Sequence, residues 1–469
     1  MEQETYDKRY ATRSLLLFAL FVVMVMYIET MLIPSLPSIS AQFGINAAEV
    51  SLVLSMYLVS GVALNPIVGK LGDIYGKKKV LVRVMAIYTV AVAMTGFAPS
   101  FPALLILRTI QGVGLTIFPL AVSLIQEQFP REKVPQALGI VGAMFGAGAA
   151  IGLPLGSLVS NNFGWQTTYH TAVPFVALFS ILIYLFIRES KNTMPNVKID
   201  YIGASFLAVF LAMLVFGLSE GSALGWTSPI ILFLIIGSLI GFVLLNRFER
   251  KIDHAILDIK LLKIKNVLNA NLIVLVIGLG FFLAYQTFAY QFESAVPIGY
   301  GESIFMTGLS MVPFAIMMLI TAPLVGRWVS RYGTKPFYLI GSGVSIFGFA
   351  LAALSTNLTT LIISTAIVGA GLASLNIPNT NSLILSIDRR TTGLATSMNA
   401  VFRFLGSALG APIAGIFIAA FGNALSFQYS FFFAIIAFLL VAVISVFSDE
   451  VLGPKTHVKY QQYQVIKEA

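Results

Sequence analysis

Long apolar runs separated by short polar segments make up most of this chain of 469 residues. A helix that crosses the hydrocarbon core of a membrane needs about 20 mostly apolar residues. Fourteen runs meet that test, and we expect each of them to be a membrane-spanning helix, numbered span 1 to span 14. The predicted spans lie near residues 14–34, 48–68, 79–98, 101–126, 135–160, 169–187, 201–218, 229–246, 267–290, 303–325, 335–354, 357–385, 392–420 and 428–447.

The polar segments predict an orientation for these spans. With the N-terminus inside, the loops on the opposite side (35–47, 99–100, 161–168, 219–228, 291–302, 355–356 and 421–427) contain no Lys or Arg. Because Lys and Arg concentrate in cytoplasmic loops, we expect a protein of the cell membrane with both termini in the cytoplasm. One span more or fewer would invert every later loop, so this pattern also supports fourteen spans. Of 29 basic residues, only Arg108 and Arg403 fall well inside spans.

Composition agrees with a chain surrounded by membrane lipids. It is 58% hydrophobic and 10% charged, whereas soluble domains contain about 25% charged residues. The net charge of +9 resides in loops, where it orients the protein, so we expect no nucleic-acid partner. The first apolar run has no cleavage site and is expected to stay as a mature span.

Several kinds of chemistry find no support in the sequence. The chain has no cysteine, and its three histidines are scattered, so we expect no metal site. It also lacks the glycine-rich loop of ATP-binding proteins. We therefore expect neither an enzyme nor a cofactor.

An internal repeat divides the chain. Gly69-Lys-Leu-Gly-Asp-Ile-Tyr-Gly-Lys-Lys follows span 2, and Gly326-Arg-Trp-Val-Ser-Arg-Tyr-Gly-Thr-Lys follows span 10, 257 residues later. Gly148-Ala-Ala-Ile-Gly-Leu-Pro in span 5 recurs as Gly406-Ser-Ala-Leu-Gly-Ala-Pro in span 13, 258 residues later. Two patterns with nearly one offset indicate two six-span copies in the same orientation, with spans 7 and 8 between them.

The predicted fold is therefore an all-α membrane protein of fourteen helices, in which two six-helix bundles form a pseudo-two-fold repeat. We expect an N-terminal bundle (1–190), two inserted helices with a cytoplasmic linker (191–266), a C-terminal bundle (267–449) and a cytoplasmic tail (450–469). Ile252, Ile256, Ile259 and Leu262 in the linker have the spacing of a helix along the membrane surface. Two parallel six-span halves are a known transporter plan, with the substrate between them.

Two sequence motifs resemble those of the major facilitator superfamily. They are the loop Gly69–Lys78 with its acidic Asp73 and the segment Arg108-Thr-Ile-Gln-Gly-Val-Gly114 in span 4. The inserted pair of spans, Trp165–Pro174 and Gly393 to Arg403-Phe-Leu-Gly406 in span 13 are similar to the fourteen-span drug:proton antiporter branch. This resemblance implies a multidrug efflux transporter that works by alternating access.

The chain departs from that branch at three positions. Span 1 has Glu29 where the branch usually has Asp, and Ser330 replaces the acid in the second copy of the loop. In span 5, Gly152-Leu-Pro154 stands where the antiporter signature usually reads Gly-Pro.

Glu29 is the main candidate for proton coupling. A carboxylate inside the membrane costs about 2.5–3.5 kcal/mol on insertion scales, which favours a functional reason for it. Glu29 lies roughly 8 Å and Arg108 roughly 10 Å from the outer face, so a pair or a shared network is feasible. Glu29 would take a proton or a cationic substrate, with Arg108 and Gln111 modulating it. Alternatively, the two charges only position helices, and Arg108 bonds backbone carbonyls.

Polar residues in later spans are candidates for lining a cavity. Asn376 and Asn379 share a face of span 12, and Asn399 and Arg403 share a face of span 13. Hydrogen bonding between helices is the alternative. A further group of candidates in span 9 consists of Tyr285, Gln286 and Tyr290 with Phe281, Phe282 and Gln291. Aromatic residues near an interface also form a lipid-facing belt, and we expect Glu293 in an external loop.

Two glycine patterns complete the candidate residues. In the loop signature, Gly69 and Gly76 suit a tight turn, Asp73 is a candidate gate, and Lys77 faces lipid headgroups. Gly148, Gly152 and Gly156 recur at four-residue spacing, which permits close helix packing. The link of these glycines and Pro154 to antiport comes from the resemblance.

We therefore expect a secondary active transporter, a monomer, that exports hydrophobic small molecules in exchange for protons. One acid among many aromatic and Met side chains suits lipophilic cations. The alternative is a symporter or uniporter for a metabolite such as a sugar, a peptide or an organic acid, since Arg108 and Arg403 are compatible with an anion.

Overall fold

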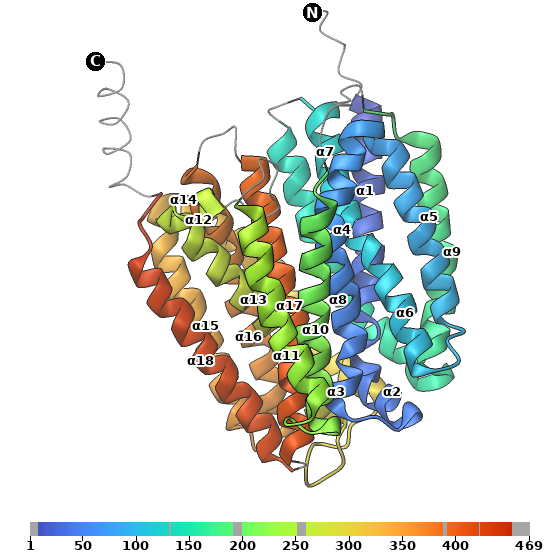
Figure 1. Ribbon diagram of the computed structural model, residues 1–469, viewed down its shortest axis with the longest axis vertical. Helices are drawn as coiled ribbons and strands as arrows, with labels where there is room; N and C mark the ends of the chain where they lie inside the picture. Colours follow the sequence, from blue (N-terminus) through green and yellow to red (C-terminus); the bar gives the residue numbers. More distant parts are fainter. Residues whose placement is uncertain are drawn as a thin grey trace, which may run out of the picture.

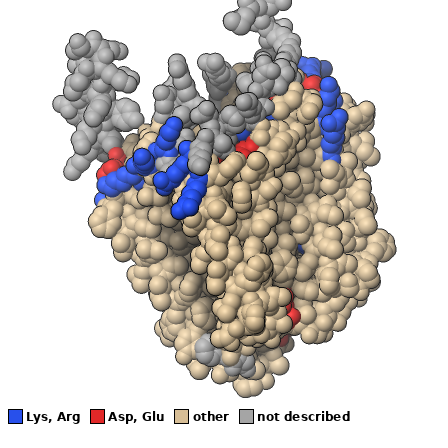
Figure 2. Space-filling view, viewed as in Figure 1, with Lys and Arg blue, Asp and Glu red and all other residues tan. Residues whose placement is uncertain are grey.

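The structure, a computed structural model, describes residues 8–130, 133–190, 199–250, 259–387, 392–421 and 423–452. The regular secondary structure of these residues is helical, and the long helices run side by side between two ends of the molecule (Figure 1). The first and the last described residues lie at the same end (Figure 1). Lys and Arg side chains gather at that end, here called the basic end (Figure 2). The opposite end is called the far end.

The helices fall into three groups along the chain. The first half comprises α1 (Lys8–Thr30), α2 (Leu36–Phe43), α3 (Ala47–Val50), α4 (Leu52–Tyr75), α5 (Lys77–Thr95), α6 (Phe101–Gln111), α7 (Ile117–Gln128), α8 (Val134–Phe163) and α9 (Trp165–Phe186). Next come α10 (Tyr201–Leu224) and α11 (Pro229–Glu249). The second half comprises α12 (Ile259–Leu262), α13 (Lys265–Glu293), α14 (Ile304–Tyr332), α15 (Thr334–Ala353), α16 (Leu358–Leu385), α17 (Thr392–Phe421) and α18 (Leu425–Phe447).

Thirteen helical segments of the described chain are long and apolar enough to cross a membrane. The predicted span at 79–98 is the one not among them, although the helix itself is present as α5. This helix has only 19 residues and begins with Lys77, Lys78 and Lys79, followed by Arg83. These four charges make α5 less apolar than the other long helices, because they occupy its first two turns at the basic end.

The structure differs from the prediction at one boundary and inside one span, and both differences have physical reasons. Residues 35–47 were expected to be a loop, but a 3-10 turn (Ile33–Ser35) and α2 extend the first helical segment to Phe43. Buried Leu36 and Ile39 hold α2 against the protein, and Gly44, with a φ of 65°, ends it in the left-handed region.

The second difference is a break in predicted span 4. Residues Gly112–Thr116 form a 3-10 segment between α6 and α7. Pro119 has no amide proton for the carbonyl of Leu115, which removes one α-helical hydrogen bond at this point. A Cβ atom on Gly112 would lie 1.8 Å from the Ser60 hydroxyl and 2.2 Å from the Tyr57 carbonyl oxygen. Only glycine therefore lets this segment approach α4 so closely.

Two predicted features extend beyond the described residues. Of the apolar stripe in the linker, Ile259 and Leu262 belong to the short helix α12, whereas Ile252 and Ile256 lie outside the described residues. The predicted tail is described only for residues 450–452.

The two halves lie on opposite sides of the molecule in Figure 1, and α10 and α11 lie in front, between them. Helix α8 packs against α14, α4 packs against α17, and α10 contacts both α4 and α17. Toward the far end, Gln286 of α13 donates a 2.7 Å hydrogen bond to the carbonyl of Ala47, and Gly308 of α14 meets Ser157 of α8. Contacts between the halves are thus well developed at the far end.

Candidate functional site

Helix α1, which carries Glu29, is held against α8 by a row of glycines. A Cβ atom on Gly148 would lie 2.5 Å from Met26, and one on Gly152 would lie 2.2 Å from the Thr30 hydroxyl. Gly156 is equally close to Met31, at 2.4 Å. These three glycines remove the side chains that would separate the helices, and so they fix the position of α1. Pro154 lies in the same helix, and its carbonyl accepts a 3.0 Å hydrogen bond from Ser157.

Glu29 lies among protein atoms, yet its side chain is partly accessible. Its carboxylate interacts electrostatically with the guanidinium of Arg108 and with the hydroxyls of Tyr57 and Tyr88. Glu29 and Arg108 do not form a direct ion pair: the salt bridges among the described residues are Lys77 with Asp73, Lys77 with Glu127, and Lys265 with Asp449. Glu29 and Arg108 are opposite charges that attract each other without direct contact, and both interact with Tyr57 and Tyr88.

Arg108 has its own set of partners in the first half. Its Nε donates to the carbonyl of Val53 at 2.8 Å, and its Nη1 donates to Gln111 Oε1 at 2.9 Å. Gln111 in turn donates to the Thr95 hydroxyl at 2.5 Å. The guanidinium carbon lies 4.2 Å from the centre of the Tyr57 ring, within the range of a cation–π contact. Arg108 thus links α4, α5 and α6, and the expected network includes a backbone carbonyl.

Several buried polar groups around Arg108 form no hydrogen bond of regular geometry within the described part of the chain. They are the hydroxyls of Tyr57, Tyr88 and Tyr169 and the Nη2 of Arg108. The Tyr57 hydroxyl nevertheless lies near Glu29, and the Tyr169 hydroxyl lies near Arg108 and Gln111. Buried polar groups are normally satisfied by protein or water. Their concentration beside Glu29 therefore indicates a place suited to polar ligand atoms or water molecules.

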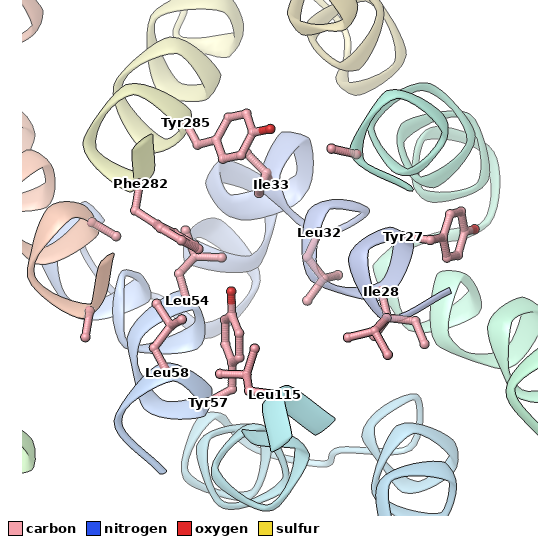
Figure 3. Close-up of a cluster of buried hydrophobic side chains, with 14 of the residues drawn as sticks. Tyr27, Ile28, Leu32, Ile33, Leu54, Tyr57, Leu58, Leu115, Phe282 and Tyr285 are labelled. Atoms are coloured by element: carbon pink, nitrogen blue, oxygen red, sulfur yellow. The ribbon is translucent and has the colours of Figure 1, made fainter. Parts of the chain in front are cut away.

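Aromatic side chains of α13 lie opposite this group. Figure 3 shows Tyr57 pointing from α4 toward the middle of the cluster, with Phe282 and Tyr285 of α13 on the other side. The Tyr285 ring lies 4.4 Å from Phe281 and 4.9 Å from Phe314 between ring centres, and Phe282 lies 6.5 Å from Tyr57. Tyr285 is 0% exposed. These rings face protein from both halves, so they are not a lipid-facing belt.

The far end of α13 differs from the prediction. Gln286 is fully buried and bonds α3, and Tyr290 and Gln291 are also buried. Glu293 was expected in an external loop, but it is the last residue of α13 and is partly buried. The helix continues because Phe288 and Phe292 pack inward against Phe431 and each other, which keeps this last turn attached to the protein.

The polar residues of α16 and α17 bond each other in two layers. Nearer the basic end, Asn379 donates to Asn399 at 3.3 Å, and Asn399 donates to Asn271 of α13 at 3.1 Å. Asn379 and Asn399 are buried, as hydrogen bonding between helices requires. Deeper in the molecule, Arg403 Nη1 donates to Asn376 Oδ1 at 2.6 Å, and both side chains are partly accessible.

The loop signature is held by the predicted Asp73 and by two acids that sequence reasoning did not single out, Glu127 and Glu189. Asp73 pairs with Lys77 at 3.5 Å, and Lys77 also pairs with Glu127. The N-terminus of α5 is capped by Glu189, which accepts from the amides of Lys78 at 2.8 Å and Lys79 at 3.0 Å. Gly76 adopts a φ of 100°, where a side chain would be strained. The expectation of a tight turn at Gly69 is wrong, because α4 continues through this residue to Tyr75 and Gly69 faces open space.

The second half repeats this arrangement. Glu450 accepts from the amides of Thr334 at 2.6 Å and Lys335 at 3.0 Å, and Gly333 also has a φ of 100°. A carboxylate at a helix N-terminus is favoured by the helix dipole. The position of each Glu just after the last long helix of its half was the signal that could have found both residues.

Comparisons with known proteins agree with one another on the family. The sequence profile of the Major Facilitator Superfamily matches residues 18–311 and 274–466. Multidrug transporter protein MdtP of Bacillus subtilis (strain 168) is 28% identical over 428 residues, which cover 90% of this chain and 78% of the relative. Riboflavin transporter RibZ of Clostridioides difficile (strain 630) is 25% identical over 387 residues, covering 82% of this chain and 83% of the relative.

Solved structures show the same fold. A bacterial homologue of the human lysosomal transporter Spinster, in an inward-facing and unoccupied conformation, superposes with a TM-score of 0.71. The similarity covers 94% of this chain and 97% of that chain at 14% sequence identity, so it concerns the fold alone.

Proposed function

Since this chain belongs to the Major Facilitator Superfamily, as a multi-pass membrane transporter and not an enzyme, we propose that it exports hydrophobic compounds in exchange for protons. Lipophilic cations are among the proposed substrates. The relative MdtP is named a multidrug transporter, which supports a broad substrate range.

Glu29 is the observation that carries this proposal. It is a carboxylate well inside a span, partly accessible, and close to the hydroxyls of Tyr57 and Tyr88, which form no regular hydrogen bond in the described residues. An acid at such a place is stable when protonated and, when ionised, needs a cation. Proton and cationic substrate would therefore compete for the same carboxylate, and such competition is the physical basis of exchange.

The proposed transport cycle uses the two halves as moving bodies. We propose fourteen spans with both termini in the cytoplasm of the cell membrane, an N-terminal bundle (1–190) and a C-terminal bundle (267–449). The packing of Ala47 on Gln286 and of Ser157 on Gly308 suits a state closed at the far end. Rocking of the halves would then expose Glu29 to the other side. One monomer contains both halves.

Metabolite uptake by symport or uniport is the second candidate. The relative RibZ is named a riboflavin transporter, and two arginines in the interior are compatible with a polar or anionic substrate. The direction of coupled flow separates the two candidates, since an antiporter moves substrate against the proton flux and a symporter moves it along.

The test is transport by purified protein in liposomes with an imposed pH gradient and tetraphenylphosphonium as the probe. We expect Glu29→Gln to abolish gradient-driven movement while the protein remains folded and inserted. Glu220→Gln, which removes an acid at the far end of α10, is the matched control and should keep transport. Gradient-driven transport at the wild-type rate by Glu29→Gln would refute proton coupling at this residue.

A further inference from the structure

Arg403 makes unusually little use of its hydrogen-bonding capacity. Its Nη1 bonds Asn376, and the remaining guanidinium donors have no partner among the residues that the structure describes. Arginine presents five N–H donors in a planar fork. The edge formed by Nε and Nη2, which fits a carboxylate or a phosphate with two parallel hydrogen bonds, therefore has no hydrogen-bond partner in the described residues, and it is here called the open edge.

The open edge of Arg403 lies inside the protein and not against lipid. Asn399, one helical turn away on the same face of α17, is buried and bonded to both α13 and α16. Gly406 and Gly410 place α17 directly on the α13 backbone, at 1.8 Å and 2.3 Å from carbonyl oxygens for an added Cβ. Arg403 is roughly 16 Å along α17 from its basic end. Its accessible surface is thus in the interior, beyond the sealed layer of asparagines.

The charge of Arg403 has no counterpart in the protein. No acidic group within the described ranges interacts electrostatically with its guanidinium, which is only desolvated by the surrounding protein. Arg108, in contrast, has Glu29 as a neighbour of opposite sign. A charge inside a membrane protein is normally paired with another charge or lies in a watery path. Arg403 is therefore an interior positive charge of the second half that no acid of the described residues compensates.

We propose that Arg403, oriented by Asn376, binds the acidic group of an amphiphilic substrate, a carboxylate or a phosphate attached to a hydrophobic body. The inference rests on the proposed function only in treating the interior as the substrate path. It widens the substrate class from lipophilic cations to amphiphilic acids and to zwitterions. The ring of Phe281, which is partly accessible on the neighbouring α13, suits the hydrophobic body.

The test uses two probes with the same hydrophobic body and opposite charge, 1-pyrenebutyrate and 1-pyrenebutylammonium. Binding to the purified full-length chain is measured at equilibrium, without a pH gradient, in nanodiscs of phosphatidylcholine. We expect Arg403→Gln to weaken binding of the acid at least tenfold and to change binding of the ammonium probe less than twofold. Arg83→Gln, which removes an exposed basic residue of α5, should leave both affinities unchanged.

Two further variants separate charge from geometry. Arg403→Lys keeps the charge but not the fork and should restore part of the affinity for the acid. Asn376→Ala should weaken binding of the acid probe threefold to fivefold, because the guanidinium of Arg403 loses the hydrogen bond that orients it. Unchanged acid binding in Arg403→Gln, or an equal loss of both probes, would overturn the proposal.

A lipid headgroup has the same chemistry as the proposed ligand, so the measurement is repeated with phosphatidylglycerol in the nanodiscs. We expect the acid to bind in both lipid compositions. If phosphatidylglycerol displaces the acid from the wild type, the headgroup is the occupant and the substrate proposal fails. These assays need no proton coupling, so the proposed function can fail in the Glu29→Gln test while this site stands, and the reverse also holds.

Discussion

Arg108 and Arg403 are the two basic residues well inside spans, one in each half, and the structure treats them very differently. Arg108 is 1% exposed, bonds Val53 and Gln111, and stacks on Tyr57. Arg403 is partly accessible and bonds only Asn376 among the described residues. Arginine is thus part of the packed interior in the first half, whereas in the second half it keeps hydrogen-bond donors available.

The difference shows that partners, and not depth alone, decide what a charge in a membrane protein can do. Nε and Nη1 of Arg108 are engaged by Val53 and Gln111, and only Nη2 forms no regular hydrogen bond, so this residue mainly organises the surroundings of Glu29. The donors of Arg403 remain available for an incoming group. Three experiments challenge this contrast, from the largest expected effect to the smallest.

Removing each arginine should separate structural from ligand-binding roles. Arg108→Gln leaves Gln111 Oε1 buried without its donor and removes the second donor to the Val53 carbonyl and the contact with the Tyr57 ring, at a combined cost of about 3 kcal/mol. We expect a clear drop in the apparent Tm of purified protein in detergent. Arg403→Gln, which loses one accessible bond, should lower the apparent Tm much less. Equal losses would break the contrast between the two residues.

Adding a methyl group between helices should sharpen the comparison of the halves. Gly152→Ala would place a Cβ 2.2 Å from Thr30, next to Glu29, and such overpacking costs about 1–3 kcal/mol. We expect reduced proton-coupled transport in liposomes. Gly410→Ala strains α17 against Leu279 in the second half and should weaken binding of 1-pyrenebutyrate instead.

The controls for these glycine variants are Gly142→Ala and Gly343→Ala, since a Cβ at either position meets nothing within 4 Å. Both should behave as wild type in the two assays. If Gly142→Ala were as harmful as Gly152→Ala, helix propensity or lipid contacts would explain the result, and close packing would not.

The smallest expected effect concerns a feature that the two halves share. Glu189→Gln and Glu450→Gln each remove a charge from a helix N-terminus, with a cost of about 0.5–1 kcal/mol. We expect small and similar decreases in apparent Tm in low-salt detergent, and smaller ones at high salt because the interaction is screened. A large effect of only one variant would show that the repeat is not equivalent at the basic end.

Much of the fold could be predicted from the sequence because the length of an apolar run directly reflects the thickness of the membrane. The helix at 36–43 could not, since its short amphipathic turn looks like a polar loop. The break at 112–116 depends on how closely Gly112 approaches the Tyr57 carbonyl. Tertiary contacts decide these cases.

The candidate site could be predicted only as a set of residues. Spacing along a helix placed Asn376 and Asn379 on one face, but it could not tell that Asn379 bonds Asn399 while Asn376 bonds Arg403. Glu127, Glu189 and Glu450 looked like ordinary loop charges, because their partners are backbone amides or lysines far away in sequence. Partner choice across helices is set by packing, which one sequence does not encode in a readable pattern.

The 3-10 segment Gly112–Thr116 has a further consequence for the span that carries Arg108. Five residues at three per turn rotate the chain roughly 100° more, and lengthen it by roughly 2.5 Å more, than the same residues in an α-helix. The side chains of α7 are therefore rotated about the helix axis, relative to those of α6, from the positions they would have in one continuous α-helix. A substitution that converted this segment to regular α-helix would turn Arg108 and Gln111 away from Val53 and Thr95 without touching any of the four residues.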